Sequence, residues 1–244
     1  MKKFLFFVLC SFFTQIVSAD TVSLDWFVDG VVQTQTSCTI GGALNLPSAP
    51  TKYGYTFRGW QPGYTQLEYI QNSAGVVAYI DTGIRPKATT QVDFKMYYST
   101  RDANAYFIGT GQTGYPAFNP FQYGNSNTNL ARAYLGNALI QLPATVNEVH
   151  IVSYQAQNSL IIFDSETYYF PNQNFNQSNV ANNIYILKGY GRLYYLRIYD
   201  NGTLVRDFIP ARRNSDRVIG MYDLVTRTFF ENGGSGAFTP GPEL

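Results

Sequence analysis

The sequence predicts an all-β protein, and three observations lead to that class. No long segment places apolar residues at helical spacing. The chain consists instead of short runs rich in Val, Ile, Tyr and Phe, separated by Gly, Asn, Asp and Pro. Aromatic residues make up 16% of the chain, including 20 tyrosines, and tyrosine suits the half-buried surface of a strand.

The first 19 residues have the pattern of a secretory signal peptide. Lys2 and Lys3 precede an apolar run over Phe4–Phe13, and Val17-Ser18-Ala19 supplies small or β-branched residues for cleavage before Asp20. The run is too short for the ~20 apolar residues that cross a bilayer. We therefore predict an exported protein, in the periplasm, on the cell surface or in the medium. Its mature chain is not expected to insert into a membrane.

Charge and cysteine content exclude several classes. Removing 19 of the 244 residues leaves 225, and it leaves 15 of the 17 basic residues against 16 acidic ones. Without a basic stripe to neutralise phosphates, nucleic acid is an unfavourable partner. Cys10 leaves with the signal peptide, so Cys38 has no intramolecular partner and is expected to be a small buried hydrophobe.

Residues 20–61 read as a module of three or four strands. Val22–Trp26 and Tyr55–Trp60 alternate apolar and polar residues, as strands with one buried face do. The turn formers Asp29-Gly30 and Gly41-Gly42 lie between them. Trp26 and Trp60 are expected to fill the core of this module.

Residues 62–244 read as a larger β domain. An Asp200-Asn201-Gly202 turn between two strand-like runs indicates a hairpin. So many short strands favour a sandwich or jelly roll over βαβ units. The expected strands are Leu67–Ile70, Val76–Ile80, Gln91–Tyr98, Ala105–Ile108, Ala131–Leu135, His150–Tyr154, Ser159–Phe163, Ile184–Leu187, Leu193–Tyr199 and Leu204–Ile209.

The stretch Ala49–Trp60, which follows Phe27-Val28-Asp29-Gly30, resembles the internalin B-type repeat, also called the Listeria–Bacteroides repeat. The resemblance covers about residues 20–60. It implies a compact β-grasp-like module of the kind found on bacterial surface proteins.

A second resemblance covers most of the remaining chain. Its opening, Gly63–Ile70 and Tyr79–Gly83, and its close, Arg197–Pro210, Val218–Asp223 and Gly236–Thr239, are similar to a concanavalin A-like (LamG-type) domain of exported gut-bacterial proteins. The resemblance implies a two-sheet jelly roll of lectin or glucanase type. That fold carries lectins, glycosidases, protein-binding modules and spacers, so it does not imply a ligand.

Catalytic patterns are weak. A retaining glycosidase needs two carboxylates ~5 Å apart. The glucanases of this fold place theirs in a Glu-x-Asp-x-x-Glu pattern on one strand, which this chain lacks. The nearest match, Asp164-Ser165-Glu166, is expected to be a turn, and the single histidine, His150, a hydrogen-bonded sheet residue. We therefore predict a protein that is not an enzyme.

Metal ligands are also sparse. One histidine and one mature cysteine exclude an ordinary zinc site. Calcium stays open because it needs only oxygen ligands, and Asp81, Asp102 and Asp164 could contribute them. No spaced ligand loop is present, so neither a metal nor another cofactor is predicted.

One aromatic and amide-rich stretch has the composition of a sugar-binding loop. Rings there could stack on a pyranose while amides bind its hydroxyls. A second, weaker candidate is the Asn/Gln-rich stretch Asn172–Asn183. Alternatively, the aromatic side chains of the first stretch fill the core or cover a sheet. The candidate ligand-binding residues are Tyr115, Phe118, Phe121, Gln122, Tyr123 and Asn125.

These observations predict a binding protein that recognises a glycan or a cell-surface protein through the sandwich. The alternative is a structural or protein–protein module without a sugar site, and a glycoside hydrolase comes third.

Overall fold

The structure is a computed structural model of the chain. It describes residues 2–9, 21–28, 31–40, 42–53, 55–73, 78–98, 106–110, 117–122, 130–171, 175 and 180–244, and for 2–9, 22, 55–62 and 117 the backbone alone. These residues form strands and turns without a helix. It follows that no helix in this part of the chain is long and apolar enough to cross a membrane. The all-β class is confirmed.

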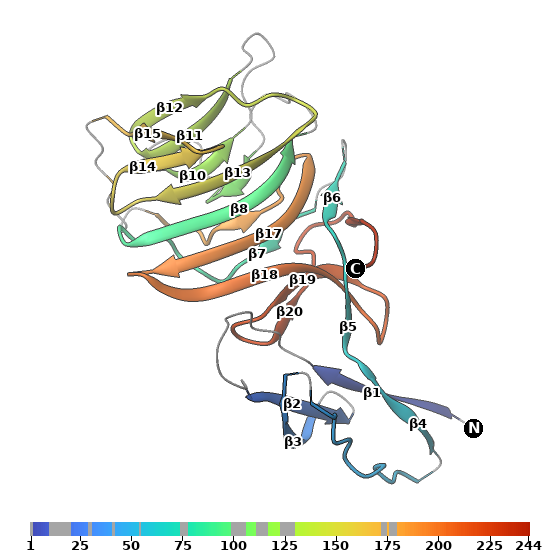
Figure 1. Cartoon of the computed structure of the whole chain (residues 1–244). Coiled ribbons are helices and arrows are strands. Elements are labelled where there is room, and N and C mark those ends of the chain that lie inside the picture. Colours follow the sequence, from blue (N-terminus) through green and yellow to red (C-terminus); the bar gives the residue numbers. More distant parts are fainter. Residues whose placement is uncertain are drawn as a thin grey trace. The chain divides into compact units, whose positions relative to one another are not determined.

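The strands are numbered in chain order (Figure 1). Their bounds are β1 Lys2–Leu9, β2 Thr21–Val28, β3 Val31–Thr39, β4 Tyr55–Pro62, β5 Tyr64–Gln66, β6 Ile70–Asn72, β7 Ile80–Asp81, β8 Thr90–Tyr98, β9 Tyr106–Gly109, β10 Ala117–Gln122, β11 Ala131–Gly136, β12 Ala138–Leu142, β13 Glu148–Gln155, β14 Leu160–Phe163, β15 Glu166–Tyr169, β16 Tyr185–Ile186, β17 Gly191–Asp200, β18 Thr203–Arg213, β19 Ile219–Asp223, β20 Thr228–Phe230 and β21 Thr239–Pro240.

The chain forms two compact units. The first comprises residues 1–65 and 212–218, and the second residues 66–211 and 219–244. The first unit contains a sheet with the order β3-β2-β1-β4. Trp26 is fully buried there, and its indole Nε1 donates a hydrogen bond to Thr36 Oγ1 at 2.7 Å. Trp60 lies among the residues described by their backbone alone.

One feature of the first unit differs from the sequence-based expectation. Cys38 is only half-buried, and its thiol contacts the carbonyl oxygen of Thr39 at 3.4 Å, because β3 is an edge strand with one open side. In the full chain, residues Lys2–Leu9 form β1, antiparallel to β2 and parallel to β4, and the cleavage of residues 1–19 stays a prediction. Phe and Val have a high strand propensity, which favours a strand over this apolar run.

The second unit contains two sheets that enclose one core. The smaller has the order β12-β11-β10-β9-β16-β7, and the main path of the larger is β15-β14-β13-β8-β17-β18-β19-β20. In Figure 1, β13, β8, β17 and β18 lie side by side in that order. Phe94 and Met96 of the large sheet and Phe107 and Ile108 of the small one have no exposed surface and belong to the same apolar cluster. The arrangement is that of an antiparallel β-sandwich.

Several expected strands are confirmed. Gln91–Tyr98 falls within β8, where buried and half-buried residues alternate along the whole strand. The expected hairpin joins β17 to β18 in antiparallel register, and Asn201 and Gly202 take φ values of 49° and 77° at its turn. Positive φ at both central residues is the type I′ geometry that matches strand twist.

Other expected strands are corrected. Leu67 makes only an isolated bridge to Glu243, and the strand there begins at Ile70. The stretch around Phe118 was expected to be a loop, yet Ala117–Gln122 forms β10 between β9 and β11. Asn and Pro lower strand propensity in isolation, but two neighbouring strands supply the hydrogen bonds that hold this segment extended.

Candidate functional site

The structure places two of the sequence-predicted binding aromatics in the core. Phe118 and Phe121 have no exposed surface. The Phe118 ring centroid lies 4.9 Å from that of Tyr154, and the Phe121 centroid 5.6 Å from that of Tyr98, both edge to face. Because a fully buried ring has no face to offer a sugar, the alternative that these rings fill the core accounts for both.

The remaining members of that candidate set divide into two groups. Gln122, at the end of β10, is also buried, with 6% of its surface exposed. Tyr115, Tyr123 and Asn125 lie outside the described residues, as does most of the stretch 172–183. Within that stretch, Phe175 packs on Phe118 with 5.8 Å between ring centroids, which gives it a packing role.

The residues considered for catalysis have structural partners. His150 is buried in β13, and its ring nitrogens contact Asp164 Oδ2 and the Thr145 carbonyl oxygen, as expected for a hydrogen-bonded sheet histidine. Asp164 and Ser165 take φ values of 48° and 78° and form the turn between β14 and β15. Asp164 and Ser165 therefore form a turn, as expected, and Glu166 is the first residue of β15.

The two described aspartates that were considered for calcium, Asp81 and Asp164, each have partners of their own. Asp81 accepts hydrogen bonds from Asn183 Nδ2 at 3.0 Å and from the Gly83 amide at 2.9 Å. Asp164 is engaged by His150, and Asp102 lies outside the described residues. Among the residues that the structure describes, no group of three or more His, Cys, Asp or Glu side chains could hold a metal ion.

The most distinctive surface of the second unit is the outer face of the large sheet. Strand alternation buries Phe94 and Met96 of β8 and turns Lys95 and Tyr97 to the opposite side. The antiparallel register sets Arg192 of β17 beside Tyr97. A shift in register between Leu193 and Tyr195 inserts Tyr194 as an extra residue, so two consecutive tyrosines are half-buried here.

Five residues of this face form a continuous group, which we call the tyrosine cluster. Its members are Tyr69, Lys95, Tyr97, Arg192 and Tyr194. The Arg192 guanidinium carbon lies 4.5 Å from the Tyr69 ring centroid and 4.8 Å from that of Tyr97. Lys95 Nζ lies 4.9 Å from the Tyr194 centroid, and the Tyr69 and Tyr194 rings meet edge to face at 5.6 Å. Each cation therefore rests on at least one tyrosine ring.

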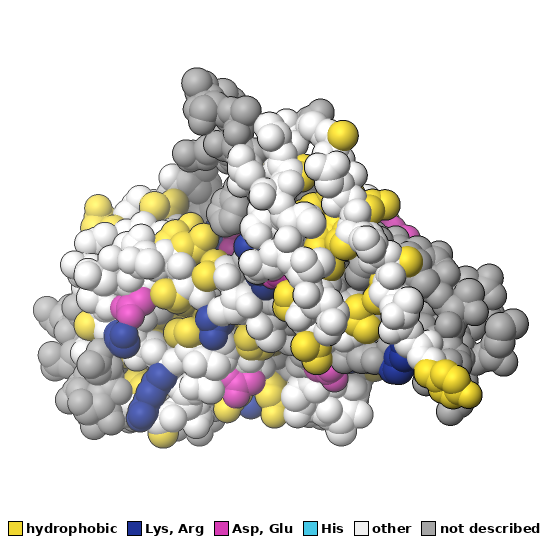
Figure 2. Space-filling view, turned by 90° about the horizontal axis from the view of Figure 1, so that it is seen from below, with side chains coloured by type: hydrophobic (Ala, Val, Ile, Leu, Met, Phe, Trp, Pro, Cys, Tyr) yellow, Lys and Arg dark blue, Asp and Glu magenta, His cyan; other side chains and the backbone are white. Residues whose placement is uncertain are grey.

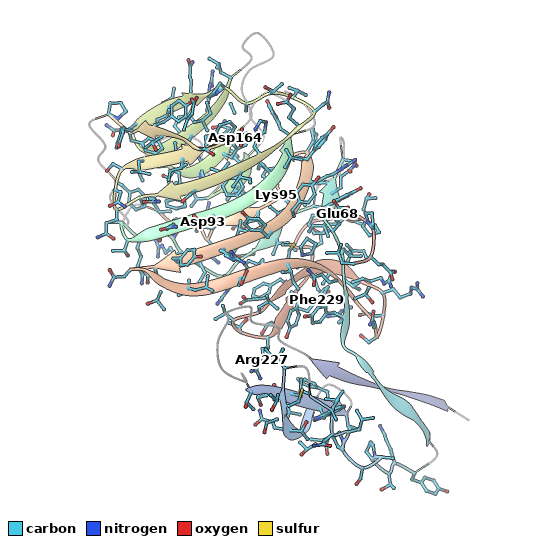
Figure 3. The ribbon with its side chains drawn as sticks, viewed as in Figure 1. Glu68, Asp93, Lys95, Asp164, Arg227 and Phe229 are labelled. Atoms are coloured by element: carbon cyan, nitrogen blue, oxygen red, sulfur yellow. The ribbon has the colours of Figure 1, made fainter. Side chains whose placement is uncertain are left out.

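Further along the same face, charged side chains are paired within the protein. Arg197 Nε donates to Asp207 Oδ1 at 3.1 Å across β17 and β18. Gln91 Nε2 donates to both carboxylate oxygens of Asp93 at 3.0 Å. In Figure 3, Asp93 and Lys95 follow one another along β8, and Glu68 lies beyond Lys95 just ahead of β6.

Partial burial raises the pKa of several tyrosine hydroxyls on this face. Desolvation raises the pKa of Tyr195, and it raises the pKa of Tyr199 as well, with a smaller contribution from the Asp93 charge. Desolvation also raises the pKa of Tyr194, although the Arg192 guanidinium acts in the opposite direction. These hydroxyls therefore keep their protons near neutral pH and can both donate and accept hydrogen bonds.

The β13–β15 part of the face is more apolar. Val149 and Ile151 of β13 are 44% and 56% exposed, and Tyr169 of β15 is 71% exposed. Strand alternation directs Val149 and Ile151 away from the buried His150 and Val152. This part offers apolar area with few hydrogen-bonding groups.

The signal for this face is present in the sequence but incomplete. Strict alternation over Leu193–Tyr199 places Tyr195 and Tyr199 on one face and Tyr194 on the other, so it finds only part of the tyrosine surface. It does not show which strand lies beside it, so Arg192 and Tyr97, 95 residues apart, could not be brought together from the sequence. The bulge that adds Tyr194 to the face is equally invisible in the pattern.

Comparisons with protein-family models, with curated proteins and with solved structures found no match to this chain.

Proposed function

We propose that this chain is an exported, non-catalytic binding protein that recognises a glycan on the outer face of its large sheet. The two resemblances support a finer description: a β-grasp-like repeat module followed by a concanavalin A-like jelly roll. The observation that carries the proposal is the tyrosine cluster, in which three half-buried rings and two cations from β8, β17 and the residue before β6 meet on one face of the large sheet.

The chemistry of the cluster suits a sugar. A pyranose presents an apolar face and a rim of hydroxyls, and it therefore needs a ring to stack on and polar groups to bind its edge. Tyr194 supplies such a ring with a polar tip, the Arg192 guanidinium lies beside it, and the Gln71 amide is hydrogen-bonded to that guanidinium. Strands position these groups more rigidly than a loop does, which lowers the entropy cost of binding.

Binding is favoured over hydrolysis on this face. A retaining glycosidase needs two carboxylates that face one scissile bond. Asp93 accepts from Gln91, and Asp207 accepts from Arg197. Both carboxylates are thus engaged within the sheet surface, and neither has the partner arrangement of an acid and nucleophile pair.

The alternative function, a protein–protein module, is supported by a different observation. Val149, Ile151 and Tyr169 expose apolar area at the β13–β15 side of the same face. Apolar and tyrosine side chains of this kind often form the centre of a protein interface. Under this alternative, the partner is a cell-surface protein.

A glycan array probed with purified residues 20–244 tests the proposal, with calcium and again with a chelator. We expect binding that Tyr194→Ala abolishes and that Tyr169→Ala, on the apolar part, leaves unchanged. A Tyr123→Ala variant tests the loop predicted from the sequence. Silence across a broad array contradicts glycan binding and transfers support to the protein–protein alternative.

A further inference from the structure

We infer that the glycan carries a carboxylate and that Arg192 of the tyrosine cluster receives it, with Lys95 as the second cation. The inference rests on the proposed function and adds the ligand class, a uronic acid or another carboxylated sugar.

The guanidinium of Arg192 is held in place before any ligand arrives. Its carbon lies 4.5 Å and 4.8 Å from the centroids of Tyr69 and Tyr97, and its Nε donates to Gln71 Oε1 at 2.9 Å. Gln71 accepts the Nε proton and the Tyr194 hydroxyl is a further hydrogen-bond partner of the guanidinium, so the donors left for a ligand are the Nη protons that Tyr194 does not use. A planar fork of this kind matches a carboxylate in a two-hydrogen-bond geometry, and fixing it in advance reduces the entropy lost on binding.

Arg192 and Lys95 differ in their partners from three cations that are paired with carboxylates. Arg197 pairs with Asp207, Lys87 with Asp200, and Arg213 with Asp216. Within the part of the chain that the structure describes, Arg192 and Lys95 have tyrosine and glutamine partners but no carboxylate within ion-pair distance. A cation beside aromatic rings has lost part of its water, and an incoming carboxylate supplies the charge it lacks.

The two cations of the tyrosine cluster favour an anion there. The cluster carries two positive charges, and the exposed Glu68 is the acidic residue whose charge acts on Tyr194. On the face of the molecule shown in Figure 2, Lys, Arg, Asp and Glu side chains are scattered rather than collected by sign. The mature chain is nearly neutral, so long-range attraction contributes little. Selectivity for an acidic sugar must then come from a local contact.

The test compares three probes by isothermal titration with residues 20–244 at about 0.15 M salt, where non-contact electrostatics are screened. The first probe is tetragalacturonic acid, and the second is its methyl ester, which keeps the sugar rings and removes the charge. The third is a carrageenan tetrasaccharide, which carries sulfate without carboxylate. We expect the acid to bind at least ~10-fold more tightly than the ester, as one or two charge-assisted hydrogen bonds require.

Matched variants assign the effect to Arg192. Arg192→Gln should weaken binding of the acid ~10-fold or more and leave binding of the ester unchanged. Arg192→Lys keeps the charge but loses the fork, so it should restore only part of the affinity. Lys188→Gln is the control, because Lys188 also rests on two tyrosine rings, Tyr79 and Tyr185, outside the cluster. Lys188→Gln removes the same charge as Arg192→Gln and should leave the affinity for both probes unchanged.

Each outcome separates this inference from the proposed function. Equal binding of acid and ester overturns the inference but leaves glycan binding intact. Binding of the sulfated probe alone overturns the carboxylate assignment, and an equal loss in the Arg192 and Lys188 variants shows nonspecific attraction and overturns the site. Failure of these probes together with silence on the glycan array overturns the proposed function and the inference with it.

Discussion

His150 and Asp164 tie strand β13 to the turn that follows β14. His150 Nδ1 lies 2.6 Å from Asp164 Oδ2, and the other carboxylate oxygen accepts the Ile151 amide at 2.9 Å. The second ring nitrogen of His150 lies 2.9 Å from the Thr145 carbonyl oxygen, and the ring stacks on Phe163 with centroids 4.9 Å apart. One carboxylate thus satisfies two donors, one of them on a histidine that is 2% exposed.

Replacing Asp164 with alanine should lower the free energy of unfolding by about 2–3 kcal/mol. The change leaves a buried histidine nitrogen and a backbone amide without their acceptor, and it forces alanine into a positive φ. Asp164→Asn should cost under about 1 kcal/mol, because asparagine tolerates this φ and keeps one acceptor oxygen. Urea unfolding measures both. Glu166→Gln, next to the turn, is the control. Equal losses of stability in the two Asp164 variants would contradict a stabilising role for the Asp164 hydrogen bonds to His150 and Ile151.

Phe118→Ala should destabilise the second unit by about 3–5 kcal/mol, because it opens a cavity where the ring packs on Tyr154. The measurement is thermal or urea unfolding, read alongside glycan binding. Tyr169→Ala is the comparison, since its exposed ring should cost less than about 0.5 kcal/mol. A Phe118→Ala variant with unchanged stability and lost binding would return Phe118 to the list of ligand-binding residues.

Removal of residues 1–19 should loosen β4. In the full chain, β4 pairs with β1 along Lys2–Val8, and cleavage after Ala19 takes that strand away. Backbone amides of residues 55–62 should therefore exchange with deuterium faster in residues 20–244 than in residues 1–244. The β2–β3 pairing, which does not involve β1, should be less affected and serves as the internal reference. Equal exchange in both chains would show that β4 finds another partner.

Acid should erode the contribution of Asp200 to stability. A hydrogen bond from Lys87, and then one from Thr89, lowers the pKa of this carboxyl below the ordinary value of an aspartate. A lowered pKa in the folded state means that the unfolded chain binds the proton more tightly, so this contribution is complete above the unfolded pKa. It is lost as the pH falls through the folded pKa.

Asp200→Asn tests this prediction. The stability difference between the natural chain and the variant should shrink as the pH falls from about 5 to about 2, when urea midpoints are compared along that series. The other carboxyls titrate in both chains, so the difference isolates Asp200. A difference that stays constant with pH would mean that the contacts of Asp200 do not depend on its charge.

Much of the sandwich could be predicted from residue patterns alone. Buried and half-buried residues alternate along the whole of strand β8, and the apolar–polar alternation of its sequence predicts this pattern. The Asp-Asn-Gly turn identified the β17–β18 hairpin, because Asn and Gly accept the positive φ that a tight hairpin needs. Both signals are local, and local signals need no knowledge of the partner strand.

The candidate site was placed differently by the sequence and by the structure. Phe118 and Phe121 are three residues apart, a spacing that strand alternation assigns to opposite faces, yet both are buried. A shift in register between Asn119 and Gln122 accounts for this, and such shifts depend on the neighbouring strand β11. Composition alone therefore marked core residues as a binding loop.

The sequence by itself determined the all-β class, the alternation along the main strands and the hairpin turn, because propensity and periodicity act between near neighbours. The tertiary structure decided which strands lie side by side and which rings stay exposed. Arg192 and Tyr97 meet only because β17 pairs with β8. Lys95 reaches Tyr194 only because a bulge turns that extra tyrosine outward. Pairing and register are long-range outcomes of packing one core, so no local pattern encodes them.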